Sequence, residues 1–164
     1  MIYFNSDYLE GSHPALMAKL NETNMVQTVG YGEDEYCAAV RVKIQNACQA
    51  PEADVHFLVG GTQTNLVAIT AFLASYEAVI APHTGHVNTH ETGAIEATGH
   101  KVIAMPGTDG KLTPAAIADA DALHCDTPGV YDEHMVLPRM VYVSDATEPG
   151  TVYPKAELPS LLHI

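Results

Sequence analysis

The chain has 164 residues, of which 47% are hydrophobic and 16% are charged. This balance predicts a folded protein with one core and argues against a disordered chain. Seven basic residues against twenty acidic ones give a formal net charge of −13. A nucleic-acid backbone or an anionic membrane surface requires clustered Lys and Arg, so we expect neither as a partner.

The cysteine content and the absence of apolar targeting segments predict the cellular compartment. Its three cysteines, Cys37, Cys48 and Cys125, are odd in number and widely spaced, which is typical of reduced thiols rather than a disulfide framework. No run of eighteen apolar residues predicts a membrane-spanning helix, and the first residues show no basic region followed by an apolar core. We therefore expect a cytoplasmic protein.

Residues 1–50 predict a helical segment. A helix is expected to follow Ser12, because Pro14 suits a first-turn position and the apolar residues after it lie close to one face. A second helix is expected from about residue 34 to residue 50, where apolar residues recur at helical spacing. The loop Gly30-Tyr31-Gly32 separates the two helices.

From residue 51 onward, strands and helices alternate. Strands are expected at residues 55–59, 78–81, 102–105 and 140–144, with helices following residues 62 and 113 and a helix after residue 90 that ends near Gly99. Residues 124–139, which contain two prolines, are expected to form a polar connection. Such alternation predicts an α/β fold with a mostly parallel sheet and flanking helices. The pattern stops after one helical turn at residues 154–158, so we expect residues 51–164 to form an incomplete α/β domain. Its unpaired sheet edges predict self-association.

The first candidate site is the turn Gly60-Gly61-Thr62, between a predicted strand and a predicted helix. Glycines let the backbone approach a ligand closely, and a helix N-terminus offers N–H groups to an anion such as a phosphate. An ordinary tight turn capped by Thr62 explains the same residues equally well. The sequence matches neither a Walker loop nor the dinucleotide fingerprint.

The second candidate site is the His-rich segment of residues 83–91. His86 and His90 are four residues apart and could bind a metal together with His83 or Glu91. Alternatively, one imidazole lies over an aromatic cofactor ring, or these histidines bind nothing. Two weaker candidates are Asn5-Ser6-Asp7 near the N-terminus and the polar residues 144–150 after a strand, where α/β sheets bind ligands.

Taken together, these segments resemble the low-specificity threonine aldolases of the β-eliminating lyase group, which use pyridoxal 5′-phosphate. The resemblance covers nearly all 164 residues. It rests on six segments that occur in the order and rough spacing of that family: Phe4-Asn5-Ser6-Asp7, Tyr31-Gly32-Glu33-Asp34, Gly60-Gly61-Thr62-Gln63-Thr64-Asn65, His86, Glu91-Thr92-Gly93-Ala94 and Thr147-Glu148-Pro149-Gly150. It implies the first part of the large domain of an aspartate-aminotransferase-like enzyme.

The resemblance also implies roles for single residues. Gly61 and Thr62 match the turn that holds the cofactor phosphate, and His86 matches the histidine that stacks on the pyridine ring and acts in catalysis. Ser6 matches a residue that binds the substrate carboxylate. Tyr31 matches a tyrosine that serves the neighbouring subunit, which implies a homodimer or homotetramer.

Two departures from the family pattern limit what the resemblance implies. Glu148, the second expected catalytic residue, stands where many members place a second histidine near the substrate hydroxyl, so the choice of substrate remains open. The family's Schiff-base lysine lies beyond the matching region, and none of the five lysines here matches its motif. Because the chemistry requires that lysine, we expect this chain to be inactive alone.

These observations predict the N-terminal part of a lyase that cleaves the Cα–Cβ bond of β-hydroxy-α-amino acids, for example threonine to glycine and acetaldehyde. The expected partner is a small amino-acid substrate, and no metal is expected. The alternatives are a β-eliminating lyase of the same family and a non-catalytic module that binds a phosphorylated ligand.

Overall fold

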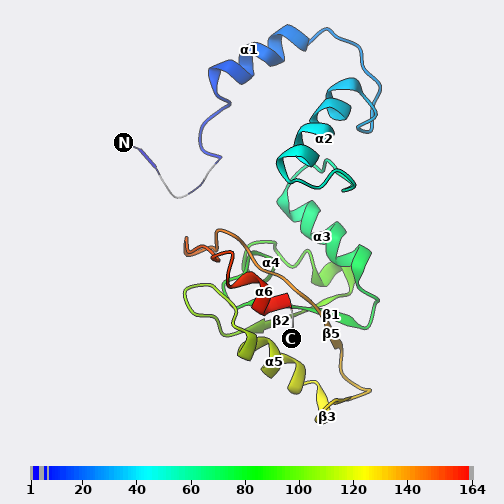
Figure 1. The fold of residues 1–164 in the computed structure, drawn as a ribbon, viewed down its shortest axis with the longest axis vertical. Coiled ribbons are helices and arrows are strands. Elements are labelled where there is room, and N and C mark those ends of the chain that lie inside the picture. Colours follow the sequence, from blue (N-terminus) through cyan, green and yellow to red (C-terminus); the bar gives the residue numbers. More distant parts are fainter. Residues whose placement is uncertain (1, 4–5, 7, 163–164) are drawn as a thin grey trace. The chain divides into compact units, whose positions relative to one another are not determined.

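A computed structural model describes residues 2–3, 6 and 8–162 (Figure 1). The chain divides into two compact units, Met1–Phe57 and Leu58–Ile164. The predicted segment Asn5-Ser6-Asp7 lies outside the described residues except for Ser6, as does the predicted end of the chain at 163–164. Within the described part, every helix falls short of the length and apolar character needed to cross a membrane.

The first unit contains the two predicted helices. Helix α1 (Pro14–Thr23) has Pro14 in its first turn, and the side chain of His13 accepts a hydrogen bond from the Ala15 amide at 3.2 Å. Helix α2 (Glu35–Ala47) begins after Asp34, whose carboxylate accepts from the Cys37 amide at 2.9 Å. Both starts therefore use a side chain to satisfy an amide that the helix itself leaves unpaired.

A three-stranded parallel sheet forms the centre of the second unit. The central strand β1 (Glu77–Pro82) pairs with β2 (Lys101–Met105) on one side and with β5 (Leu137–Val141) on the other. The order β2-β1-β5 and the parallel pairing confirm the predicted α/β class. Parallel strands require crossover connections, and the helices between them provide these crossovers.

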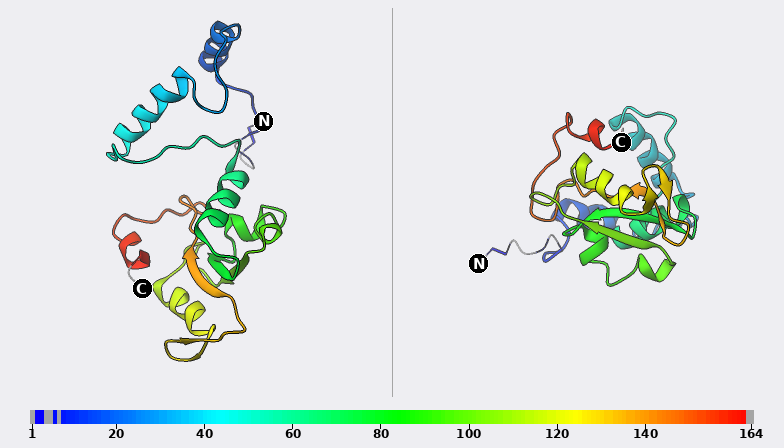
Figure 2. Two further views of the ribbon diagram at one scale, coloured as in Figure 1. Left: turned by 90° about the vertical axis from the view of Figure 1, so that its right-hand side faces the viewer. Right: turned by 90° about the horizontal axis from the view of Figure 1, so that it is seen from below.

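Alternate side chains of β1 enter two separate apolar clusters, one on each face of the sheet. Ala78 and Ile80 pack with residues of α5 (Pro114–Ala122) and α6 (Leu158–Leu162). Val79 and Ala81 pack against α3 (Gly61–Phe72) and the short helix α4 (His86–Thr89). Figure 2 shows α5 along one side of the sheet in its right-hand view. Burial on both faces explains why β1 is a continuous apolar run.

The structure corrects four sequence-based predictions. Residues 55–59 form no strand, and Val59 is 96% exposed, because no other strand of the described chain pairs with this segment. The last sheet strand covers Leu137–Val141 rather than 140–144. The helix predicted between residue 90 and Gly99 is reduced to turns and a 3₁₀ turn η1 (Glu96–Thr98), while the short helix α4 precedes it. Thr92 and Gly93 both have positive φ there, which ends any helix.

The fourth correction concerns residues 124–139, which were expected to be an irregular connection. They contain an antiparallel pair, β3 (Cys125–Thr127) and β4 (Val130–Tyr131). Gly129, with φ of 79°, lies in the turn between the two strands. Pro128-Gly129 is a turn signal that the sequence does contain, but two or three residues on each side are too few to show strand periodicity.

Candidate active site

The carboxyl end of the sheet brings together two segments that are distant in sequence. Helix α4 follows the end of β1, and the polar segment 144–150 follows the end of β5. The amide of His83 also donates to the carbonyl of Met105 at 2.9 Å, which ties this loop to the end of β2. Ligands of open α/β sheets bind at this end of the strands, so the polar residues here form the candidate site.

His86 is held through its ring by a buried carboxylate. Its Nδ1 lies 2.9 Å from Oε1 of Glu91, whose side chain is fully buried, whereas the side chain of His86 is 42% exposed. The amide nitrogen of the Asn65 side chain donates to the same oxygen of Glu91. Asn65 belongs to α3, so the contact joins α3 to the segment that follows β1.

His86 is also held through its backbone. Its N–H donates to Oε1 of Glu148 at 2.7 Å, and the hydroxyl of Ser144 donates to that oxygen at 2.6 Å. Glu148 thus links the ends of β1 and β5 across 62 positions of sequence. Glu148, which stands where the family pattern has a histidine, is therefore in direct contact with His86.

Two carboxylate oxygens of this cluster are buried without a hydrogen-bond partner in the described chain: Oε2 of Glu91 and Oε2 of Glu148. Buried polar atoms in proteins are nearly always paired, since leaving one unpaired costs about 1–3 kcal/mol. Such atoms are expected where a structure gives up stability for the binding of a ligand or the positioning of a reactive group. We call Asn65, His86, Glu91, Ser144 and Glu148 the histidine–carboxylate cluster.

The predicted phosphate turn lies one helical turn before Asn65. Helix α3 begins after Gly60 without a side-chain cap, and Gly61 and Thr62 are exposed in its first turn. A Cβ atom at Gly60 or Gly61 would meet no other atom within 4 Å, so the space beside this turn is open. An uncapped helix start offers free amides to a phosphate, and the cluster is joined to α3 one helical turn further along, at Asn65. The open helix start and the cluster therefore fit pyridoxal phosphate.

The metal interpretation of the His-rich segment receives no support from the geometry. The rings of His86 and His90 are 5.5 Å apart and tilted by 53°, and Nδ1 of His86 is engaged by Glu91. Over the described residues, no three His, Cys, Asp or Glu side chains converge as a metal site would require. A cavity of about 800 Å³ lies elsewhere, between the end of β2 and α5, and no member of the cluster lines it.

The two predicted substrate-binding residues belong to the first unit. The Ser6 hydroxyl accepts a bond from the Tyr8 amide at 3.5 Å, and Tyr31 is fully exposed with φ of 63°. Their expected roles stay predictions.

Asn65 and Glu91 are functional candidates to which sequence reasoning gave no role in holding His86. Both stand inside quoted motifs, but only the metal interpretation used Glu91, and Ser144 was named only as part of the candidate segment 144–150. Nothing in the sequence shows that Asn65 and Glu91, 26 positions apart, meet at one oxygen.

Comparison with known proteins decides the family. The family model described as beta-eliminating lyase matches residues 4–164. The chain belongs to the beta-eliminating lyase family. Its relatives include the low specificity L-threonine aldolase of Pseudomonas aeruginosa, which is 34% identical over 160 residues. The enzyme of the same name from a Pseudomonas species is 32% identical over 160 residues. Each alignment covers 96% of this chain and 44% of the relative.

A solved structure, that of Leishmania major threonine aldolase, is similar to this chain with a TM-score of 0.89 and 48% sequence identity. The match covers 94% of this chain and 44% of that one. The chain therefore spans less than half the length of these relatives. The resemblance drawn from the sequence motifs and the α/β fold it implied are both confirmed.

Proposed function

We propose that this chain is the cofactor-holding part of a pyridoxal-phosphate-dependent aldehyde-lyase that cleaves the Cα–Cβ bond of β-hydroxy-α-amino acids such as threonine. Family membership supports the lyase class, and the names of the relatives favour aldol cleavage over β-elimination. The observation that carries the proposal is a carboxylate-held imidazole that Glu91 and Asn65 connect to α3, whose uncapped start lies one helical turn before Asn65.

Each group in this arrangement has a distinct task. The amides of Gly61 and Thr62 at the start of α3 bind the phosphate, where the helix dipole favours negative charge. The imidazole of His86 covers one face of the pyridine. When bound, the cofactor supplies an electron sink for the carbanion formed at Cα. Glu148 fixes the backbone of His86 and has a second oxygen without a partner in the described chain, and we propose that it acts in catalysis.

The remaining roles come from the resemblance and are part of the same proposal. Ser6 binds the substrate carboxylate, and Tyr31 serves the site of a neighbouring subunit in a homodimer or homotetramer. The protein acts in the cytoplasm on a small amino acid, without nucleic acid or membrane as a partner. Subunit mass measured by analytical ultracentrifugation tests the assembly directly.

We further propose that the 164-residue chain alone does not turn over substrate. Lys101 opens β2 at the amino end of the sheet, opposite to the candidate site, and Lys111 pairs with Glu157 at 3.0 Å. Incubation of the chain with pyridoxal phosphate and threonine should release no acetaldehyde beyond that of a chain-free control. Sustained formation of glycine and acetaldehyde would contradict this part of the proposal.

The cofactor role is tested by calorimetric titration with pyridoxamine 5′-phosphate, which has no aldehyde to react with lysines. The chain should bind it, and His86→Ala should weaken binding by about five- to tenfold through the loss of ring stacking. His86→Phe should retain most of the affinity, and the exposed His134→Ala is the matched control.

Two results of that titration would oppose the proposal. Equal affinity of the wild type and His86→Ala would remove the stacking role. If inorganic phosphate bound as tightly as pyridoxamine phosphate, the pyridine would not be recognised, and a module for phosphorylated ligands would be the better account.

A further inference from the structure

We propose that Glu91 is a positioning residue that fixes the tautomer of His86, and that Asn65 ties this carboxylate to the phosphate-binding helix. The inference deepens the function proposed above and rests on it for the identity of the ligand. Its geometric part, the state of the His86 ring, can be tested without any ligand.

The first step concerns the proton on His86. Oε1 of Glu91 already accepts from the side-chain amide of Asn65, so the 2.9 Å contact between this acceptor oxygen and Nδ1 of His86 places the proton on Nδ1. A neutral imidazole carries one ring proton, and Nε2 is then left as the acceptor. The ring therefore offers one defined face and one defined acceptor to whatever binds beside it.

The second step concerns what holds Glu91. The side-chain amide of Asn65 donates to Oε1, the same oxygen that faces His86. Two donors from two different elements converge on a single carboxylate atom, which leaves Glu91 little freedom to rotate. Asn65 follows Gly61 by one helical turn, so the position of the imidazole is coupled to the helix start that we assign to the phosphate.

The third step concerns the energetic cost of burying the Glu91 carboxylate. The Glu91 side chain is fully buried, and its Oε2 has no partner within the described chain. A buried carboxylate held on only one oxygen is a poor device for stability, since an apolar side chain would fill the same space without desolvating a charge. Its contacts instead position a partly exposed ring, which is the pattern of a residue that acts through another.

The experiment uses ¹⁵N-histidine labelling of the 164-residue chain, with ring nitrogen shifts read at pH values where the His86 signals no longer change. The wild type should show a protonated Nδ1 and an unprotonated Nε2. Glu91→Ala should convert His86 to a tautomer mixture resembling that of free histidine. Glu91→Gln, whose carbonyl still accepts from Nδ1–H, should preserve the wild-type pattern. Glu96→Gln is the matched control, because it alters an exposed carboxylate nearby.

The wild-type spectrum decides the proposal even if Glu91→Ala fails to fold. Protonation at Nε2 with a bare Nδ1 in the wild type would overturn it, and so would an unchanged tautomer in a folded Glu91→Ala chain. Asn65→Ala offers a second route: it should broaden or shift the His86 signals while Glu91 remains. Wild-type His86 signals in Asn65→Ala would overturn the coupling to α3.

Titration with pyridoxamine phosphate separates this inference from the proposed function. Glu91→Ala should bind the probe about tenfold more weakly than the wild type, whereas Glu91→Gln should differ from it by less than about threefold. If the wild type did not bind the probe but showed the expected tautomer, the proposed function would fail while the positioning of His86 stood. If the wild type bound the probe and all variants bound it equally, the positioning role would fail alone.

Discussion

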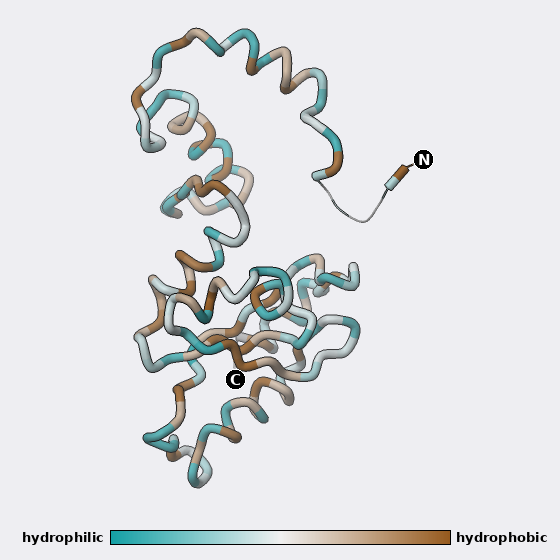
Figure 3. Tube along the Cα trace, turned by 180° about the vertical axis from the view of Figure 1, so that it is seen from behind, coloured by the Kyte–Doolittle hydropathy of each residue, from teal (hydrophilic) through white to brown (hydrophobic). Residues whose placement is uncertain are grey.

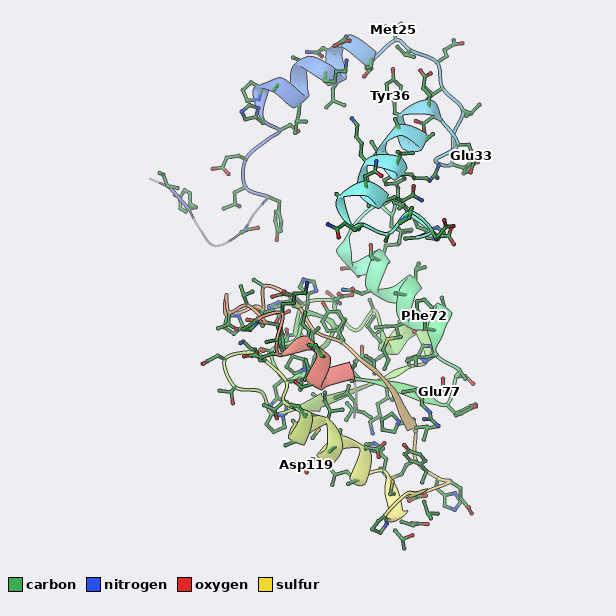
Figure 4. All side chains as sticks on the ribbon, viewed as in Figure 1. Met25, Glu33, Tyr36, Phe72, Glu77 and Asp119 are labelled. Carbon is green, nitrogen blue, oxygen red and sulfur yellow. The ribbon has the colours of Figure 1, made fainter. Side chains whose placement is uncertain are left out.

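The two units of the chain differ in where their apolar side chains go. In the second unit, the alternate residues of β1 enter apolar clusters on both faces of the sheet. In the first unit, no described residue is buried, although apolar residues recur along both helices (Figure 3). Leu16 is 60% exposed, and the labelled Met25 and Tyr36 are also exposed (Figure 4).

The contrast shows that a helical pattern and a folded core are separate properties. Both helices of the first unit have side-chain caps, which satisfy amides locally and need no partner. Short helices are marginal in water without tertiary packing. The second unit contains a core, which supports the partly unpaired carboxylates of the histidine–carboxylate cluster.

The largest effect is expected from a cavity in the sheet. Ile80→Ala empties a position that is 3% exposed and should lower the free energy of unfolding of the second unit by about 2–5 kcal/mol. Leu16→Ala in α1 is the matched control and should change stability by less than about 0.5 kcal/mol. Urea unfolding followed by circular dichroism measures both. Equal losses of unfolding free energy in the two variants would show that Leu16 is buried in solution. That result would contradict the difference between the two units.

A smaller loss is expected from the link between the ends of β1 and β5. Glu148→Ala removes the acceptor of both the His86 amide and the Ser144 hydroxyl, and should cost about 1–3 kcal/mol. Glu148→Gln keeps an acceptor oxygen and should cost less. The control is Glu157→Gln, which breaks a half-exposed ion pair with Lys111 worth about 1 kcal/mol or less. The same unfolding assay ranks the three, and the reverse order would contradict the assigned contact.

The second unit should lose stability in base. Burial raises the pKa of Tyr153, and the hydrogen bond to Asp121 raises the pKa of Tyr131. The unfolded chain then releases these protons near the ordinary value of about 10, while the folded chain retains them. The contribution of these two tyrosines to the free energy of unfolding should be constant below pH 10 and decrease above it. Tyr131→Phe should make this decrease smaller. Stability that rose above pH 10 would contradict the sign.

The first unit should instead be sensitive to acid, and only locally. The thiol and the amide of Cys37 hydrogen-bond to Asp34 and lower the pKa of its carboxyl. The cap is therefore intact above the ordinary Asp value of about 4 and lost as pH falls through the lowered value. Amide signals of α2 should show this loss in the wild type. Asn caps helices equally well but does not titrate, so Asp34→Asn should remove the pH dependence. Equal titration of the two chains would rule out the cap as its cause.

Sequence reasoning succeeded where the signal is local. Pro14 and Asp34 mark helix starts through their own chemistry, and the apolar run of β1 reflects burial on both faces. It was wrong at residues 55–59, because forming a strand depends on a neighbour to pair with and not on the apolar run alone. The hairpin at 125–131 was too short for its periodicity to be visible.

The candidate site was predictable only in part for the same reason. The glycine turn before α3 has a local signature, and His86 was singled out through the family resemblance. The contacts that hold His86 join it to Glu148, 62 positions away, and to Asn65 through Glu91. Such contacts arise from the parallel sheet, which places the ends of β1 and β5 side by side. Glu148 was predicted to be catalytic from the family pattern alone, because the sequence does not show its contact with the backbone of His86.

The most direct test of the account is an amide NMR titration of the 164-residue chain with pyridoxamine 5′-phosphate. The account predicts that the amides of Gly61, Thr62 and His86 shift together and saturate at one ligand concentration. Shifts confined to the residues that line the cavity beside α5, with these three amides unmoved, would contradict it.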